Sequence, residues 1–192
     1  MHKYSCDNDR RDYVSAVTML ICIIVSYLIS DTIAAYVANN DFFVKILIFI
    51  VIAGPFTLWT YLADGLSVLF LKVSGIRNCT GEYTGTLKSS YDSFERKYDV
   101  TVKIVHKFRN IEIRLDTSTS TSHSVTASLH QDGNRTKITY TYENEGSLEM
   151  DFNRHIGTGI ITIEGQTIKG IYYTHPDRGT SGTFELIKRI GQ

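Results

Sequence analysis

Aromatic and basic residues in the C-terminal two-thirds of the chain are the side chains best suited to bind a ligand. The set that we single out is Lys97, Tyr98, Tyr142, Arg154, Tyr172 and Arg178. Tyrosine rings stack on nucleobases, and guanidinium or ammonium groups pair with phosphate oxygens. The combination predicts a site for a small ligand that carries both bases and phosphates. A purely structural interpretation stays open, because tyrosine is also a common strand residue.

The sequence lacks the residue spacings that mark enzymes. No HExxH, GxSxG, P-loop or paired-cysteine motif is present, and the six histidines are scattered. Carboxylates such as Glu112, Asp116 and Glu185 fall on the outward positions of predicted strands, where solvated faces normally place them. We therefore predict a binding protein with no catalytic residues, no cofactor and no metal site.

The overall charge limits the partners further. The 192 residues include 20 basic and 20 acidic ones, so the net charge is zero, and a basic field for long nucleic acid is missing. The three cysteines are odd in number and one lies in a hydrophobic segment, which argues against a disulfide framework and suits a reducing compartment.

From Gly81 onward, apolar residues alternate with polar ones and β-branched and aromatic types dominate, as in half-buried strands. Eight strands are predicted, at about 81–89, 98–106, 110–117, 122–131, 136–143, 157–164, 167–174 and 180–189. Short turns and one buried face favour a small eight-stranded antiparallel up-and-down, lipocalin-like β-barrel, in which no edge is exposed. An open sandwich is the alternative fold.

The connections of such a barrel alternate between its two ends. Those at about 90–97, 117–122, 144–156 and 175–179 lie at the end away from the membrane, and most are longer than those at 107–109, 132–135 and 164–166. Long loops on a rigid scaffold are where binding usually occurs. The six residues named above lie in these longer connections or at the strand ends next to them.

Residues 14–63 predict two membrane-spanning helices joined by a short turn. Residues 42–63 carry one charge, Lys45, and their length fits the roughly 20 helical residues that a bilayer core of about 30 Å requires. The first span, residues 14 to about 38, contains Asp31. The chain is thus divided into a tail (1–13), two spans (14–63), a linker (64–80) and the barrel (81–192).

Asp31 has two interpretations. A carboxylate within the hydrocarbon is costly and is a functional candidate by default. If the helix ends at Ser30, however, Asp31 is merely interfacial.

Basic residues that flank the two spans predict the orientation. Lys3, Arg10 and Arg11 precede the first span, and Lys72 and Arg77 follow the second, whereas the turn between them has only Lys45 nearby. Positive residues favour the cytoplasmic side. Both termini and the barrel are therefore expected in the cytoplasm.

Two spans followed by this barrel resemble a known family. The run GEYTG opens the barrel and GTGIITIEGQTIKGIYYTHPDRGTSGTFELIK closes it. Nearly the whole chain is similar to the two-transmembrane β-barrel effectors of bacterial cyclic-oligonucleotide antiphage signalling (CBASS), also described as SMODS-associated two-transmembrane β-strand-rich effectors. The resemblance implies that the barrel binds a cyclic dinucleotide, that chains assemble as homo-oligomers, and that the spans disrupt the bacterial inner membrane in abortive infection.

Two other functions remain open from the sequence. One is a membrane-tethered, lipocalin-like carrier or scaffold for an apolar ligand, and the other is an anchor whose barrel docks a protein partner. An apolar barrel mouth would favour the carrier.

Overall fold

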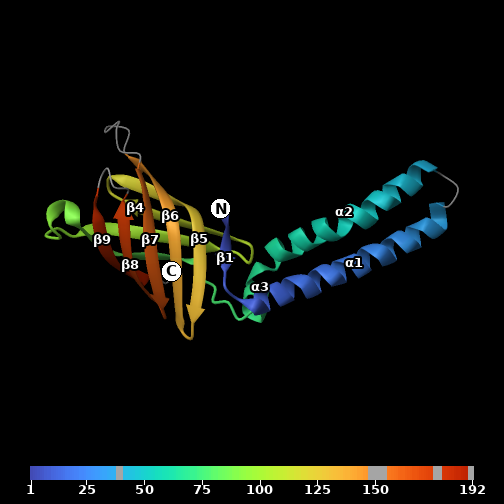
Figure 1. Ribbon diagram of the computed structural model, residues 1–192, viewed down its shortest axis with the longest axis horizontal. Helices are drawn as coiled ribbons and strands as arrows, with labels where there is room; N and C mark the ends of the chain where they lie inside the picture. Colours follow the sequence, from blue (N-terminus) through green and yellow to red (C-terminus); the bar gives the residue numbers. More distant parts are fainter. Residues whose placement is uncertain (38–40, 147–154, 175–178, 190–192) are drawn as a thin grey trace. The chain divides into compact units, whose positions relative to one another are not determined.

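The computed structural model describes residues 1–37, 41–146, 155–174 and 179–189 (Figure 1). The chain forms two compact units. Residues 1–7 and 77–192 make a β-rich unit, and residues 8–76 make a helical unit.

The β-rich unit is a closed barrel. Its strands are β1 (His2–Cys6), β2 (Gly81–Ser89), β3 (Tyr98–His106), β4 (Asn110–Thr117), β5 (Ser120–Asp132), β6 (Arg135–Gly146), β7 (His155–Glu164), β8 (Thr167–Thr174) and β9 (Ser181–Lys188). From β2 to β9 each strand pairs antiparallel with the next, and β9 returns to pair with β2. This is the up-and-down order that alternating hairpin turns predict.

The predicted count of eight strands is wrong by one. The ninth strand, β1, comes from the segment that the sequence assigned to a tail, and it lies between β4 and β5. Its five residues are too few for a periodic pattern to stand out, and its partners lie more than 100 positions away in the chain.

Alternate residues of the strands fill the barrel, as the hydrophobic period of two predicts. Val100, Val102 and Ile104 of β3 are at most 3% exposed, and Ile111 and Ile113 of β4 are at most 1% exposed. The sequence left the inward positions of β7 and β8 undecided, because both faces of these strands are apolar. The inward residues are Gly157, Gly159, Ile161 and Ile163 on β7, and Ile168, Gly170 and Tyr172 on β8.

Four inward-facing glycines each lie directly opposite an aromatic residue of the neighbouring strand. The pairs are Gly157 with Tyr142, Gly159 with Tyr140, Gly170 with Phe184 and Gly182 with Tyr172. A Cβ added to any of these glycines would lie 2.1–2.4 Å from an atom of the opposite ring. The rings therefore lie over the glycine backbone, along the inner wall of the barrel.

The end of the barrel that carries the β5–β6 and β7–β8 turns is tied together by one arginine. The guanidinium of Arg77 donates to the carbonyl oxygen of Asn134 at 3.1 Å and to that of Gly165. Its backbone N–H donates to Oε1 of Gln131 at 3.0 Å. Arg77, which the sequence used only to predict membrane orientation, thus also bridges two hairpin turns.

The helical unit contains α1 (Asp9–Val37), α2 (Asp41–Gly65) and α3 (Ser67–Val73). Asn8 precedes α1, and its side-chain oxygen accepts the backbone N–H of Arg11 at 2.8 Å, which is the role of an N-cap. Along α1, every fourth residue from Cys22 to Ser30 is buried, whereas Leu20, Ile24 and Leu28 are at least half exposed. Small buried residues at this spacing allow α1 and α2 to pack closely.

Among the described residues, α1 is long and apolar enough to cross a membrane, over Asp9–Ile33. The segments Ala53–Gly65 and Ser67–Val73 pass the same criterion only together, and they are bent by 86°. Several side chains of the second predicted span, residues 42–63, lie outside the described part, so that span stays a prediction. The helix does not end at Ser30 but continues to Val37, so Asp31 lies inside α1. The side chain of Asp31 is exposed.

The glycine–aromatic pairs give a test of the fold. Gly159→Val would force a side chain into the Tyr140 ring, whose Cζ atom lies 2.4 Å from the position of the added Cβ. We expect a loss of about 1–3 kcal/mol in the free energy of unfolding, as for overpacked cores. The measurement is thermal unfolding of the full chain in detergent, followed by the β-sheet circular dichroism signal. Thr158→Val, on the exposed face next to it, is the matched control, and equal midpoints for the two variants would contradict this account of the inner wall.

Candidate ligand-binding site

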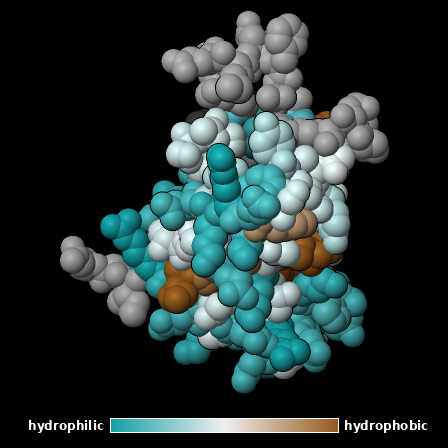
Figure 2. All heavy atoms as spheres, turned by 90° about the vertical axis from the view of Figure 1, so that its left-hand side faces the viewer, coloured by the Kyte–Doolittle hydropathy of each residue, from teal (hydrophilic) through white to brown (hydrophobic). Residues whose placement is uncertain are grey.

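One end of the barrel carries four connections: β2–β3, β4–β5, β6–β7 and β8–β9. We call it the loop-rich end. The β2–β3 connection contains a short 3-10 helix, η1 (Ser90–Asp92). Residues 147–154 and 175–178 lie outside the described part. Figure 2 shows the side of the molecule that carries the β2–β3 connection, where the visible surface is mostly hydrophilic with a few apolar side chains.

The inner wall changes character along the barrel axis. Toward the opposite end it is apolar, with Ile104, Ile111 and Ile163 at most 1% exposed. Toward the loop-rich end the inward residues include tyrosines, serines and an asparagine beside the apolar Leu87: Ser89, Ser122, Tyr142, Asn144 and Tyr172. The side-chain amide of Asn144 donates to Oγ of Ser122 at 2.8 Å. This half of the interior offers ring faces and hydrogen-bonding groups, which suit a polar, flat ligand.

Tyr172 is held in place by its neighbours on two strands. Its ring lies over Gly182 of β9, where an added Cβ would be 2.2 Å from the ring. Its hydroxyl donates to Oγ of Ser89 on β2 at 2.9 Å. One face of the ring rests on backbone, so the other face is the one directed to the barrel interior.

Tyr142 has the same arrangement on the neighbouring pair of strands. Its ring lies over Gly157, with an added Cβ 2.3 Å away. The ring is 6% exposed, and its centroid lies 6.4 Å from that of His155 and 6.1 Å from that of Tyr140. The registers place Gly159 opposite both Tyr140 on β6 and Tyr172 on β8. Tyr172 is therefore in register with Tyr140, and Tyr142 lies two residues further along β6 toward the loop-rich end.

Tyr98, at the start of β3, is bound to the loop that precedes it. Its hydroxyl donates to Oδ2 of Asp92 at 3.1 Å, and the same carboxylate oxygen accepts the backbone N–H of Arg96. Desolvation raises the pKa of the Tyr98 hydroxyl, and the hydrogen bond to Asp92 and the charge of its carboxylate raise it further. Asp92 thus closes the β2–β3 loop onto the rim of the barrel.

The structure brings together some of the predicted site residues. Tyr98, Tyr142 and Tyr172 lie at the loop-rich end, and Lys97 is exposed in the loop before β3. Arg154 and Arg178 lie outside the described residues. Asp31 belongs to the helical unit.

Sequence reasoning missed the inward polar residues Ser89, Ser122 and Asn144. Asn144 continues the buried row of Ile138, Tyr140 and Tyr142 at a spacing of two, so extending the predicted strand at 136–143 would have identified it. The sequence analysis instead assigned residues 144–156 to a connection.

Other parts of the described barrel fit a phosphate ligand less well. A shallow depression of about 600 Å³ on β2, β3 and β4 is lined by Thr84, Gly85, Thr86, Asp99, Val100, Thr101, Asp116, Thr117 and Ser118. It contains two carboxylates and no basic side chain, so its charge opposes an anion. No group of His, Cys, Asp and Glu side chains within the described residues has the arrangement of a metal site.

A comparison with models of protein families assigns the barrel to a known family. Residues 74–188 match the family model of the Cap15 cyclic dinucleotide receptor domain. The chain belongs to this family. No curated protein matches the sequence.

The region that matches the Cap15 receptor domain ends with β9 at Lys188 and begins before β2. It therefore covers the polar inner wall and all the connections of the loop-rich end. The family is one of receptor domains rather than of catalytic domains. Strand β1 and helices α1 and α2 lie outside the matched region.

The link between Asp92 and Tyr98 gives a pH test of this end of the Cap15 domain. Asp92→Asn removes the charge that raises the Tyr98 pKa, so we expect that pKa to fall toward the ordinary tyrosine value. Carbon-13 NMR of labelled tyrosine over alkaline pH measures it, with Tyr98→Phe to assign the resonance. Asp99→Asn, an exposed carboxylate next to Tyr98 in the sequence, is the control. A Tyr98 pKa that is the same in Asp92→Asn as in the unmodified chain would contradict the contact.

Proposed function

We propose that this chain is an antiphage effector of the CBASS type, whose barrel binds a cyclic dinucleotide at the loop-rich end. Binding leads to assembly of the helices of several chains in the bacterial inner membrane and to loss of the membrane barrier. The single observation that carries the proposal is the match of residues 74–188 to the Cap15 cyclic dinucleotide receptor domain.

The inner wall of the loop-rich end supports this choice of ligand. A cyclic dinucleotide presents two bases and two phosphates in one compact ring. Tyr142 and Tyr172, each backed by a glycine, offer flat faces for the bases, and Ser89, Ser122 and Asn144 offer hydrogen bonds. Stacking on an aromatic side chain is worth about 1–3 kcal/mol per base.

The phosphates need cationic partners from the connections. Lys97 precedes β3, Arg154 precedes β7, and Arg178 lies between β8 and β9. We propose these three residues as the phosphate contacts, because they flank the strands that carry the tyrosines. The geometry of Arg154 and Arg178 is outside the described residues, so this assignment rests on their positions in the chain.

The apolar-carrier alternative fits this interior poorly. A site for a lipid-like ligand is lined mainly by apolar side chains. Here the apolar half of the barrel is occupied by its own buried isoleucines and leucines, and the half that reaches the loops carries hydroxyl and amide groups.

The membrane part of the proposal rests on the helical unit. Helix α1 meets the length and hydropathy of a span, and α2 is proposed as the second span of the hairpin. Basic residues before and in the first turn of α1 (Lys3, Arg10 and Arg11) and after α2 (Lys72 and Arg77) favour a cytoplasmic barrel. A cytoplasmic barrel has access to a nucleotide that is made in the cytoplasm.

Neighbouring tyrosines of β8 provide a matched pair for testing the site. Tyr172→Leu removes an inward ring, whereas Tyr173→Leu removes an outward ring that is 50% exposed. We expect the first change to weaken cyclic dinucleotide binding at least about fivefold, the lower end of one lost base stack, and the second to have little effect. Isothermal titration of the full chain in detergent measures both. Equal affinities would place the ligand elsewhere.

Two arginines at opposite ends of the barrel test the proposed phosphate contacts. Arg178→Ala should weaken binding by about tenfold or more, because a charge-assisted hydrogen bond contributes roughly 1.5–3 kcal/mol. Arg135→Ala should do little, since Arg135 is exposed and pairs with Glu164 at the opposite end. Isothermal titration of the full chain with cyclic dinucleotide measures the affinity of both variants. A loss with Arg135→Ala and none with Arg178→Ala would reverse the assignment of the two ends.

A further inference from the structure

The barrel has one weak seam, between β4 and β5. These two strands pair directly only where residues 114–116 meet residues 121–123, next to their connecting turn. The neighbouring pair β3–β4 continues over residues 100–106, and β5–β6 continues over nearly the whole of both strands. Toward the opposite end of the barrel, β4 and β5 separate.

Strand β1 fills the gap that this separation leaves (Figure 1). It pairs antiparallel with residues 110–111 of β4 and parallel with residues 127–129 of β5. Ser124, at the point where the strands diverge, accepts the backbone N–H of Ile113 at 2.9 Å and contacts Nε2 of His2 at 2.8 Å. A β-bulge in β5 directly follows Ser124. One serine thus joins all three strands.

A buried tyrosine anchors β1 in the barrel. Tyr4 is 6% exposed, and its ring packs edge-on against His106, with 5.1 Å between the centroids. Nδ1 of His106 accepts the backbone N–H of Cys79, so Nε2 carries the proton and donates to the Tyr4 hydroxyl at 3.0 Å. That hydroxyl in turn donates to the carbonyl oxygen of Phe108. Every polar group of this chain of contacts has a partner.

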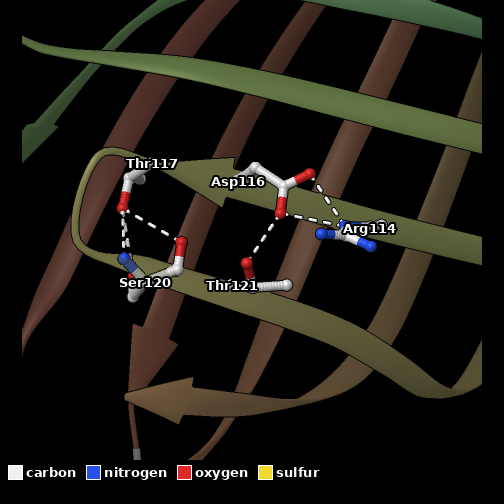
Figure 3. A network of polar contacts seen from close by, with 5 residues as sticks. All are labelled: Arg114, Asp116, Thr117, Ser120 and Thr121. Carbon is white, nitrogen blue, oxygen red and sulfur yellow. Dashed lines mark hydrogen bonds and ion pairs between the residues drawn. The ribbon is translucent and has the colours of Figure 1, made fainter. Parts of the chain in front are cut away.

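The seam extends from the loop-rich end to the last residue of β1, Cys6. At the loop-rich end, Asp116 accepts from Nε of Arg114 at 2.9 Å and from the hydroxyl of Thr121 at 2.7 Å, and Thr117 bonds to Ser120 across the turn (Figure 3). At the other end, β1 ends at Cys6 and α1 begins at Asp9. A change in the pairing of β4 with β5 therefore alters the strands with which β1 pairs. Only residues 7 and 8 of the chain connect β1 to α1.

We propose that β1, residues His2–Cys6, is a latch that holds the barrel seam closed in the resting protein. Ligand binding at the loop-rich end alters the β4–β5 pairing and releases β1, and this release frees the start of α1 for assembly. The inference rests on the proposed function for its ligand and its membrane response. The latch itself follows from the incomplete β4–β5 pairing and the anchored strand between them.

The test is a disulfide that locks the latch. Lys3 and Asn110 are antiparallel partners on β1 and β4, so Lys3→Cys with Asn110→Cys lie within reach of a disulfide. The native cysteines are first replaced (Cys6→Ser, Cys22→Ser, Cys79→Ala). The full chain is reconstituted in vesicles of phosphatidylethanolamine and phosphatidylglycerol that contain carboxyfluorescein. Cyclic di-AMP, cyclic di-GMP and cyclic GMP-AMP are added outside as probes.

We expect the oxidised, locked protein to bind the active probe as the reduced protein does, but to release dye at least about tenfold more slowly. Adding reductant should restore the release. Lys169→Cys with Glu185→Cys, which pairs β8 with β9 far from the seam, is the matched control and should respond to probe in either redox state. Equal dye release from the oxidised and reduced latch variants, with binding intact, would overturn the latch.

A second variant tests the latch without any ligand. Tyr4→Phe keeps the ring but removes the hydroxyl between His106 and Phe108, so β1 should detach more often. We expect the backbone amides of residues 2–6 to exchange hydrogen several-fold faster than in the unmodified chain, and an unchanged exchange rate would overturn the latch. This measurement needs neither ligand nor membrane response, so it decides on the latch even if none of the probes binds and the proposed function fails.

Discussion

The close contact of aromatic rings with glycines across neighbouring strands is the constraint on which the barrel interior depends. A barrel of about eight strands has an interior that its own side chains just fill. Four rings pointing inward would overfill it if each opposed another side chain. Opposite Gly157, Gly159, Gly170 and Gly182 the rings instead lie along the wall. The four rings are thereby accommodated inside the barrel without opposing another side chain.

The same constraint accompanies a division of the barrel interior into an apolar half and a half that carries polar groups. Toward the turns that Arg77 bridges, isoleucine and leucine side chains meet in the centre and are almost fully buried. Toward the loops, Tyr142 and Tyr172 lie against the wall and leave hydroxyl and amide groups facing inward. A rigid apolar half keeps the rims of the other half in register, which is what a preorganised ligand site requires.

Much of the barrel was predictable because its strands are long and regularly alternating. The eight predicted strands agree with β2 to β9 to within three residues at each end, since one buried face imposes a period of two on every strand. The predicted tyrosines of the site lie at the loop-rich end for the same reason. Strand β1 was not predictable, because its pairing depends on partners distant in sequence rather than on its own pattern. Asn144 was missed because a polar residue at an inward position breaks the pattern on which the prediction relies.

The place of β1 in the barrel changes how the helices are attached to the receptor. In a chain with a free N-terminal tail, the link after α3 would be the sole connection between the barrel and the helices. Here the chain passes between the two units twice, near residue 7 and near residue 76, and the first passage begins in a strand of the barrel. That strand occupies the seam with the shortest direct pairing and is held by Tyr4, by Ser124, by the ion pair between the N-terminal ammonium and Glu112, and by a few backbone pairs. Because few bonds hold β1, the equilibrium between attached and released β1 can be shifted by a ligand of ordinary affinity. A ligand that binds the released form better by a few kcal/mol is enough to reverse that equilibrium.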